Sequence, residues 1–552
     1  MRYRFRFWVG RSVCGALALI LTVGTTDAAE RGFLGHCSDA SNYQNCYQSP
    51  RHHPQPGIPG LGGLLIPIIL NNLPPVQNPV PNTVSPVSNS DGVPRRKVPP
   101  KAPPRVARND RHPPVYLPQP PATHGARAFP PPPGEIRFRR AEVLVELPAS
   151  TVGPDIDRLL RRHAVTEVES FRIALLGTTL HLWRIPDSRE VGAVVTEIGG
   201  EPIVASAQPN YVYTLQQDVS INGLPTAEPD ALPYYAMAKL HVDEARALAS
   251  GDKVLVAVLD TAIDDTHPDL SGVVEKRFDA ILCTGWHREK SASVGCASTQ
   301  LAQDGAIDRA HGTSIAGAIA ARGHFPGVAP KVRLLQVRAF DAGQSGEQGS
   351  SWSIIRGADW ASQNNASVIN MSFAGPADPM LGRVLAAAFK KGVTLIASAG
   401  NEGRRAPAPA PFPAADKNVV AVTATDADDR LYDSANIGTY VAVAAPGVRV
   451  YLPTVHGGYA YETGTSFSAA FVSGVAALAL QHRPPLTPDA LRKLLTTTAK
   501  PLGGAGGTAE FGAGLVDAQR ALSQELAGLD KSIELPRGIA PDKANFHRLP
   551  LP

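Results

Sequence analysis

The mostly apolar run at residues 253–259, which ends at Asp260, constrains the fold of this chain more than any other feature. A continuous apolar and β-branched run of this length is typical of a strand buried on both faces of a parallel sheet. Carboxylates that end such strands lie at the crevice where α/β proteins bind their ligands. The sequence therefore predicts an α/β fold, with Asp260 at the ligand-binding edge of its sheet.

Two later segments place a histidine and a serine at the starts of helices. In AHGTSIAGAIAAR, apolar residues recur at helical spacing behind His311. In YETGTSFSAAFVSGVAALAL, Ser466 lies between a Gly-Thr pair and small apolar residues, which predicts a turn that opens into a helix. A hydroxyl in front of helix amides suits an acyl-transfer nucleophile, although a serine there also caps ordinary helices.

The chain order Asp260, His311, Ser466 supplies the three groups of a nucleophilic triad. An imidazole titrates near neutrality and can take the serine proton, while a carboxylate holds the ring in the correct tautomer. Taken alone, Asp260 is explained as a turn residue and His311 as a capping or surface group. Their joint occurrence favours catalysis.

Three segments resemble the catalytic boxes of the subtilisin-like (subtilase) serine peptidases: VAVLDTAIDDTHPDL, HGTSIAGAIAA and GTSFSAAFVSGVAAL. The resemblance covers roughly residues 233–524, the expected peptidase domain. It implies a subtilisin-like parallel sheet flanked by helices. It also implies a serine endopeptidase that hydrolyses peptide bonds through an acyl-enzyme, with Asp260, His311 and Ser466 as its catalytic residues.

The same resemblance assigns residues that bind the substrate. In SAGNEG, Asn401 would donate from its side chain to the oxyanion, and the main-chain amide of Ser466 would be the second donor. A substrate strand would pair with the segment that resembles the family's substrate-binding strand. Its residues are Ser372, Phe373, Ala374 and Gly375.

Some positions depart from the family pattern, and they affect specificity and metal binding. Ala374 replaces a glycine that would leave more room for a bound peptide, and Phe467 replaces a methionine beside the serine. The chemistry requires no cofactor. Asp269 matches one ligand of the family's calcium site, but the Asn-rich calcium loop is missing from RGHFPGVAP, so a structural calcium lacks support.

The N-terminus has the pattern of an exported protein. Residues 1–29 combine an arginine-rich start, an apolar core and a small-residue exit, which predicts a cleaved secretory signal peptide and a secreted or periplasmic protein. A permanent anchor is the alternative, although the core is too short to span a membrane. Beyond Cys14, the cysteines form two close pairs, which predicts disulfides; free buried thiols are the alternative. The pairs are Cys37 with Cys46 and Cys283 with Cys296.

Two segments between the signal and the next domain have no predicted core. Residues 30–49 form a short cysteine-containing segment, and residues 50–135 are rich in proline with scattered basic side chains. Such a composition cannot bury a core, so the second segment is expected to be a disordered linker. Its basic charge would attract an anionic cell surface, although solvation is the simpler explanation.

Residues 138–216 are expected to form a small ferredoxin-like α+β domain, because strand and helix patterns alternate in the order strand–helix–strand–strand–helix–strand. Its position and its PNYVYTL ending resemble subtilisin propeptides, which assist folding and inhibit the enzyme. A processing linker at 217–232 follows, and we expect the segment 217–235 to pass through the active site and be cut there. A domain that stays attached is the alternative.

The remaining features limit the partners. The formal net charge is only +4 over 552 residues, so the charge balance does not indicate nucleic-acid binding. The expected partners are peptide or protein substrates and the chain's own propeptide, and residues 525–552 form a C-terminal tail. Two other functions fit the same sequence: a catalytically weak or inactive surface-binding or scaffold protein of this fold, and a processing protease specific for one partner.

Overall fold

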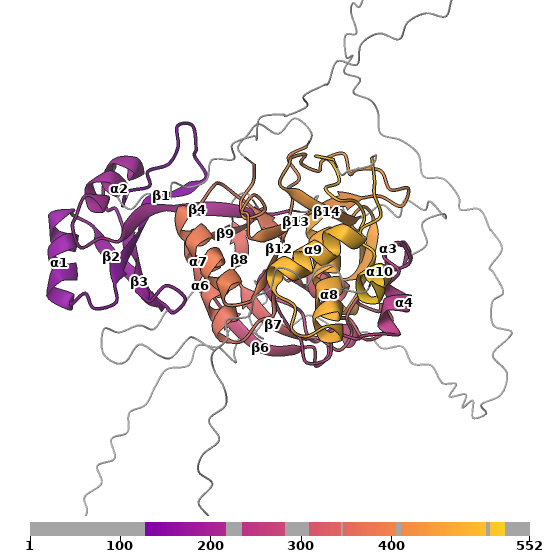
Figure 1. The fold of residues 1–552 in the computed structure, drawn as a ribbon. Coiled ribbons are helices and arrows are strands. Elements are labelled where there is room, and N and C mark those ends of the chain that lie inside the picture. The colour runs from indigo at the N-terminus through magenta and orange to yellow at the C-terminus, as the bar shows by residue number, and fades with distance from the viewer. Residues whose placement is uncertain are drawn as a thin grey trace, which may run out of the picture. The chain divides into compact units, whose positions relative to one another are not determined.

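The computed structural model describes residues 127–216, 234–281, 309–343, 346–403, 410–503 and 508–524. They form a small N-terminal domain and a larger α/β domain (Figure 1). The predicted signal peptide, the 30–49 segment, both cysteine pairs, the processing linker at 217–232 and the C-terminal tail lie outside the described residues.

The small domain has the expected order of strands and helices. Its four strands form an antiparallel sheet in the order β2-β3-β1-β4. The elements are β1 (Phe138–Pro148), α1 (Gly153–Arg162), β2 (Thr166–Ile173), β3 (Thr178–Arg184), α2 (Val191–Gly199) and β4 (Ser206–Leu215).

The small domain begins earlier in the sequence than residue 138, where we expected it to start. The main-chain oxygen of Arg127 accepts a hydrogen bond from Ala207, and the amide of Phe129 donates to the same residue. These residues belong to the stretch at 50–135 that we expected to be a linker, so the domain includes at least its last residues. The part of that stretch before Arg127 lies outside the described residues.

The larger domain contains a seven-stranded parallel sheet in the order β14-β13-β12-β10-β5-β7-β6. This confirms the predicted parallel sheet between helices. Its strands are β5 (Leu255–Asp260), β6 (Val274–Asp279), β7 (Arg333–Arg338), β10 (Val368–Met371), β12 (Thr394–Ser398), β13 (Val419–Thr425) and β14 (Val441–Pro446). Short strands lie outside this sheet: β8 (Phe340–Gly343), β9 (Gly346–Ser350), β11 (Phe373–Ala374), β15 (Val450–Pro453) and β16 (Tyr459–Glu462).

Helices cover both faces of the parallel sheet. Val256 and Val258 of β5 pack in one apolar cluster with α5 and α8, while Ala257 and Leu259 pack in another with α6 and α7. Both faces of β5 are therefore buried, which explains its unbroken apolar sequence. The helices are α3 (Tyr235–Lys239), α4 (Val242–Arg246), α5 (Ala310–Ala320), α6 (Ser351–Gln363), α7 (Pro379–Lys390), α8 (Thr465–His482), α9 (Pro488–Thr498) and α10 (Ala518–Ser523).

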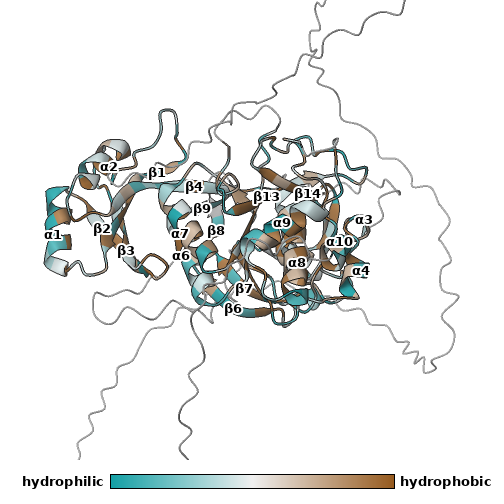
Figure 2. Ribbon diagram, in the orientation of Figure 1, coloured by the Kyte–Doolittle hydropathy of each residue, from teal (hydrophilic) through white to brown (hydrophobic). Residues whose placement is uncertain are grey.

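The apolar content of each helix matches how much of the helix is buried. Figure 2 shows more apolar residues along α8 than along α1 or α4, which carry more hydrophilic side chains. All side chains from Thr465 to Ala479 are buried, and most are small, so α8 packs closely against several strands. Among the described helices, none combines the length and apolar character that a membrane-spanning helix needs.

Strand β4 joins the two domains through main-chain pairing. It is antiparallel to β1 in the small domain, and its C-terminal half pairs with β9 and β11 of the larger domain. Apolar residues on one face of the small sheet, among them Leu144, Ile173 and Leu180, are buried in the same cluster as α6 and α7. The end of β4 is thereby brought to the edge of the parallel sheet where Asp260 lies.

Candidate active site

The parallel sheet and two helices position the three predicted triad residues. Asp260 is the last residue of β5, His311 is the second residue of α5, and Ser466 is the second residue of α8. Gly312 allows α5 to approach the end of β5, because a Cβ there would lie 2.7 Å from the main-chain oxygen of Thr261. The amide of Gly312 donates to the Thr261 hydroxyl at 3.0 Å, which fixes the first turn of α5 beside Asp260.

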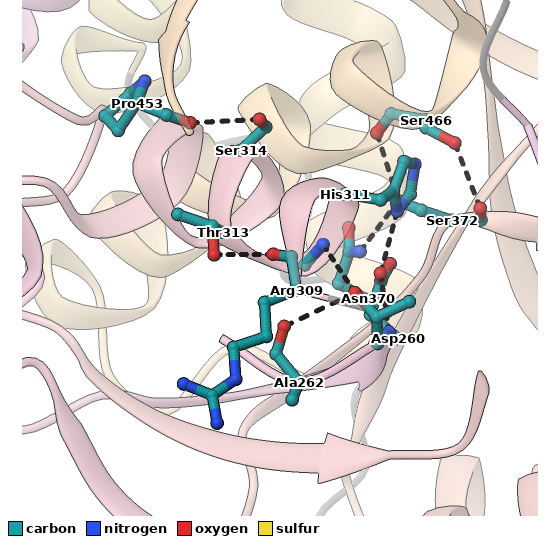
Figure 3. A network of polar contacts seen from close by, with 12 residues as sticks. Asp260, Ala262, Arg309, His311, Thr313, Ser314, Asn370, Ser372, Pro453 and Ser466 are labelled. Atoms are coloured by element: carbon teal, nitrogen blue, oxygen red, sulfur yellow. Dashed lines mark hydrogen bonds and ion pairs between the residues drawn. The ribbon is translucent and has the colours of Figure 1, made fainter. Parts of the chain in front are cut away.

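The carboxylate and the imidazole are in direct contact. Nδ1 of His311 lies 2.7 Å from Oδ1 of Asp260, and both side chains are fully buried. The same oxygen accepts the amide hydrogen of Thr261 at 2.8 Å, which orients the carboxylate. In Figure 3 the ring of His311 lies between Asp260 and Ser466. A proton held at Nδ1 by the carboxylate leaves Nε2 as the basic nitrogen of the ring.

Ser466 is held at the start of α8 by two hydrogen bonds with Ser372. Its hydroxyl donates to the main-chain oxygen of Ser372 at 3.0 Å, and the Ser372 hydroxyl donates to the main-chain oxygen of Ser466 at 3.0 Å (Figure 3). Phe467, where the family pattern has methionine, is buried with its ring centroid 5.6 Å from that of His311. The phenyl ring therefore packs beside the imidazole.

Asn401 follows β12 and is oriented by the residue before Ser466. Its Oδ1 accepts hydrogen bonds from the amide of Thr465 at 3.2 Å and from the Thr465 hydroxyl at 2.7 Å. Its Nδ2 is buried and has no hydrogen-bond partner among the described residues. An unused amide donor close to the Ser466 main chain is the arrangement that an oxyanion requires.

The end of β4 lies against these residues. The amide of Ser466 donates to the main-chain oxygen of Gln216 at 3.2 Å, and the amide of Gln216 donates to the main-chain oxygen of Ser372 at 3.3 Å. The side-chain oxygen of Gln216 accepts the amide hydrogen of Asn401 at 2.7 Å, and the residue is only 4% exposed. The carbonyl of Gln216 is therefore the peptide carbonyl that the structure places at the Ser466 amide.

Three of the four residues predicted to bind substrate, Ser372, Phe373 and Ala374, contact the main chain of β4 or of Gln216, whereas Gly375 does not. Phe373 pairs with Leu215 and Ala374 with Thr214, so the Cβ of Ala374 is compatible with a paired strand. The amide and oxygen of Gly375 instead pair with Phe412.

Gly375 has a different contact with β4. A Cβ at this position would lie 2.4 Å from the ring of Tyr213, so the missing side chain makes room for that ring. Gly375 therefore contributes to the binding of β4 by leaving room for the Tyr213 ring, and not by main-chain pairing with β4.

Strand β9, which pairs with β4 on its other side, was not predicted from the sequence. Thr214, Tyr213 and Val212 pair with Gln348, Gly349 and Ser350 of β9. The GEQGS sequence of this strand has no apolar alternation, which is the signal that would have indicated it. Strand β4 is therefore bound between β9 and β11.

The residues around Asp269 do not fit a calcium ion. Its carboxylate accepts hydrogen bonds from the amides of His324 and Phe325, at 2.8 and 2.7 Å, and from the hydroxyl of Tyr459 at 2.8 Å. Calcium takes six to eight oxygen ligands, whereas these neighbours present hydrogens to the carboxylate. Within the described ranges, no group of three or more His, Cys, Asp or Glu side chains could hold a metal ion.

Comparisons with known proteins point to one family. Residues 251–514 match the Subtilase family. Subtilisin of Bacillus pumilus is 35% identical over 277 residues, which cover 49% of this chain and 92% of that protein. Subtilisin NAT of Bacillus subtilis subsp. natto is also 35% identical over 277 residues; the match covers 49% of this chain and 66%, just under two thirds, of that protein.

A solved structure supports the fold. Fervidolysin from Fervidobacterium pennivorans, described as a keratinolytic enzyme related to subtilisin, superposes with a TM-score of 0.55 at 24% identity. The superposition covers 73% of this chain and 64% of fervidolysin. At this identity the likeness concerns the arrangement of helices and strands.

Proposed function

The chain belongs to the subtilase family of serine peptidases, and on that premise we propose that it is a serine endopeptidase that first cuts its own chain after Gln216. The observation that carries this proposal is the contact between the Ser466 amide and the Gln216 carbonyl, beside the paired side chains of His311 and Asp260.

The proposed reaction uses the buried groups in their usual roles. His311 takes the hydroxyl proton of Ser466 as the oxygen attacks the peptide carbonyl, and Asp260 stabilises the imidazolium that forms. The hydroxyl must first leave the main-chain oxygen of Ser372, to which it donates in this structure. The amide of Ser466 and Nδ2 of Asn401 would stabilise the oxyanion. His311 then protonates the leaving amine, and water hydrolyses the acyl-enzyme.

Self-cleavage follows from how β4 is bound. The N–H of Gln216 is directed to Ser372 and its C=O to Ser466, while β9 and β11 fix the preceding residues on both sides. This is how an extended peptide is presented by strand addition for attack at one carbonyl. After cleavage of the Gln216–Gln217 bond, the small domain would remain on the site as an inhibitor, which makes the chain a zymogen.

The experiment that tests the proposed function uses the enzyme freed from its small domain. We expect a fluorophosphonate probe to label Ser466 and the protein to hydrolyse casein. A correctly folded protein that does neither would instead support a scaffold or surface-binding protein of this fold.

Export and disulfide formation are part of the same proposal. The sequence pattern of residues 1–29 supports delivery outside the cytosol, where the pairs Cys37 with Cys46 and Cys283 with Cys296 would be oxidised. The basic proline-rich segment would then be available to an anionic cell surface. The signal peptide, both cysteine pairs and the proline-rich segment before residue 127 lie outside the described residues, so their sequence alone supports the proposal.

The proposed inhibitory complex contains an ion pair between the domains whose carboxylate is buried and whose guanidinium side chain is partly exposed. Glu146 of β1 is 1% exposed and pairs with Arg383 of α7, while the hydroxyls of Ser206 and Thr178 donate to the same carboxylate. Burial alone would raise the pKa of Glu146, but the guanidinium of Arg383 and the two hydroxyls outweigh it and hold this pKa below its ordinary value of 4.5. The charged carboxylate therefore stabilises the complex.

We expect Glu146→Gln to speed release of the cleaved small domain at neutral pH by about tenfold, since a charged hydrogen bond contributes about 1.5 kcal/mol when one partner is solvated. Because the pKa is lowered in the complex, the stabilisation is present above pH 4.5 and is lost as the pH falls through the lowered value. Wild-type release should accelerate there, and the variant should lack that acceleration. The measurement is the amount of small domain released from the purified cleaved complex at each pH, because a protonated imidazole cannot act as the base and peptidase activity would not report release there.

Glu201→Gln is the matched control. Glu201 also has a lowered pKa, caused first by its hydrogen bond from Arg162, but its partners Arg162 and His163 belong to the small domain itself. This variant should release the small domain at the wild-type rate. Equal effects of the two variants would show that the pair with Arg383 does not hold the domains together.

A further inference from the structure

Tyr213, three residues before Gln216, has a side chain that is completely buried in the larger domain. Its main chain pairs with Gly349 of β9. Thr214 and Leu215 pair with β11 on the other side of the strand. The ring therefore occupies a fixed position relative to the Gln216 carbonyl.

Aromatic and glycine residues form the walls around this ring. The ring of Phe373 meets it edge to face, with centroids 5.7 Å apart and an interplanar angle of 83°. Phe340 supports Phe373 from behind at 5.0 Å. On another side, Gly375 leaves the space that a Cβ would fill, 2.4 Å from a ring carbon. These walls contact the ring through apolar and aromatic groups and do not involve its hydroxyl, so a phenyl ring would meet the same walls.

A buried carboxylate lies at the hydroxyl end of the ring. The Tyr213 hydroxyl donates to Oδ2 of Asp378 at 3.2 Å, with the main-chain oxygen of Pro376 slightly farther away at 3.4 Å. Asp378 is only 2% exposed and caps the start of α7 through the amide of Leu381. Burial raises the pKa of Asp378, although four hydrogen-bond donors oppose that effect.

The four donors to Asp378 come from both domains. The hydroxyl of Ser351 and the amide of Leu381 belong to the larger domain. Gln208 and Tyr213 belong to β4, so both leave when the small domain departs. The free enzyme would then have a pocket with apolar walls and a carboxylate that has lost two of its donors. A phenol satisfies both parts of this pocket, whereas a phenyl ring fills the walls but leaves the carboxylate without its donor.

We propose that this pocket selects tyrosine at the fourth residue before the cleaved bond of protein substrates, and that Asp378 is the specificity-determining residue. The proposal rests on the proposed peptidase function and extends the way β4 is bound to the substrates that replace it. Lysine would also meet the carboxylate, but the close-packed aromatic walls are shaped for a ring.

The test compares peptides that differ only at this position. Each carries X-Thr-Leu-Gln, with X as Tyr, Phe, Leu or Lys, joined to a fluorogenic aminocoumarin leaving group. With enzyme freed from its small domain, we expect kcat/KM to be about tenfold higher for Tyr than for Phe, because Phe leaves the buried carboxyl group of Asp378 without one of its donors. Leu and Lys should be cut more slowly than Tyr.

Asp378→Asn should bring the Tyr and Phe values within about twofold of each other. Asparagine caps helices as well as aspartate does, so α7 should remain folded. The matched control is Asp359→Asn on α6. Asp359 is also a buried carboxylate, but it accepts hydrogen bonds from the amides of Ala174 and Leu175 and not from Tyr213, so the Tyr to Phe ratio should stay at its wild-type value.

If Asp378→Asn does not fold, Gly375→Ala provides a second test. The new Cβ would lie 2.4 Å from a carbon of the bound ring and clash with it. Cleavage of the Tyr and Phe peptides should therefore fall relative to a peptide with alanine at X. If peptides ending in glutamine are not cut, the same preference is measured as enrichment of Tyr over Phe in a peptide library.

Equal rates for Tyr and Phe, or a preference that survives Asp378→Asn, would overturn the inference. An enzyme that reacts with the fluorophosphonate probe and hydrolyses casein without preferring Tyr would overturn this inference alone. An enzyme that does neither would overturn the proposed function.

Discussion

Ser466→Ala is expected to lower kcat for peptide hydrolysis by on the order of 10⁶-fold, the size of loss known from subtilisin, a relative of this chain. Without the hydroxyl, no acyl-enzyme can form, and His311 has no proton to transfer from the nucleophile. The oxyanion donors remain, so a small residual rate above the uncatalysed reaction should persist.

The measurement requires the small domain to be removed from the variant, because the variant is not expected to cut its own chain. The variant is cut within residues 217–233 by a protease of different specificity, and the cleaved small domain is then released at low pH and separated. Rates are measured on the same fluorogenic peptide as for the wild type. Ser362→Ala is the control, since Ser362 is a buried serine of α6 whose hydroxyl only donates to the main chain of its own helix. It should keep wild-type activity, and more than 1% activity in Ser466→Ala would contradict the assignment.

Asp260→Asn is expected to lower kcat by on the order of 10⁴-fold while KM changes by less than about twofold. An amide in place of the carboxylate donates toward Nδ1 of His311, so the ring proton moves to Nε2 and the base is lost. Because Asp260 is 0% exposed and contacts Nδ1, the substitution should not alter how a peptide is held.

Asp279→Asn is the control for this variant. Asp279 is likewise a buried carboxylate at the end of a strand of the same sheet, and it pairs with Arg338 rather than with a predicted catalytic residue. Thermal unfolding of both variants separates loss of activity from loss of fold. A decrease of less than tenfold in Asp260→Asn, or a similar decrease in Asp279→Asn, would rule out an orienting role for Asp260.

The parallel sheet, and the positions of Asp260 at a strand end and of His311 and Ser466 at helix starts, were predictable because each signal is local. The apolar run before Asp260 and the helical spacing behind His311 and Ser466 are visible within about ten residues of sequence. The structure confirms the fold and brings His311 into contact with Asp260, while the catalytic roles stay predictions.

The tyrosine pocket was not predictable, because its contacts join distant parts of the chain. Tyr213 and Asp378 are 165 residues apart, and neither has a local pattern that indicates the other. The surroundings of Asp269 were not predictable for the same reason, although this residue matches a calcium ligand of the family in sequence. Its carboxylate is occupied by donors from His324, Phe325 and Tyr459, which no local pattern revealed.

Self-cleavage after Gln216 is tested most directly by the intact mass of the chain after folding, compared between the wild type and Ser466→Ala. We expect the wild type to yield a fragment that ends at Gln216 and a partner that begins at Gln217, because the Gln216 carbonyl lies at the Ser466 amide. The variant should stay uncut at this bond. Cleavage of the variant at the same bond, or a wild-type cut elsewhere with this bond intact, would contradict cleavage of the Gln216–Gln217 bond by Ser466.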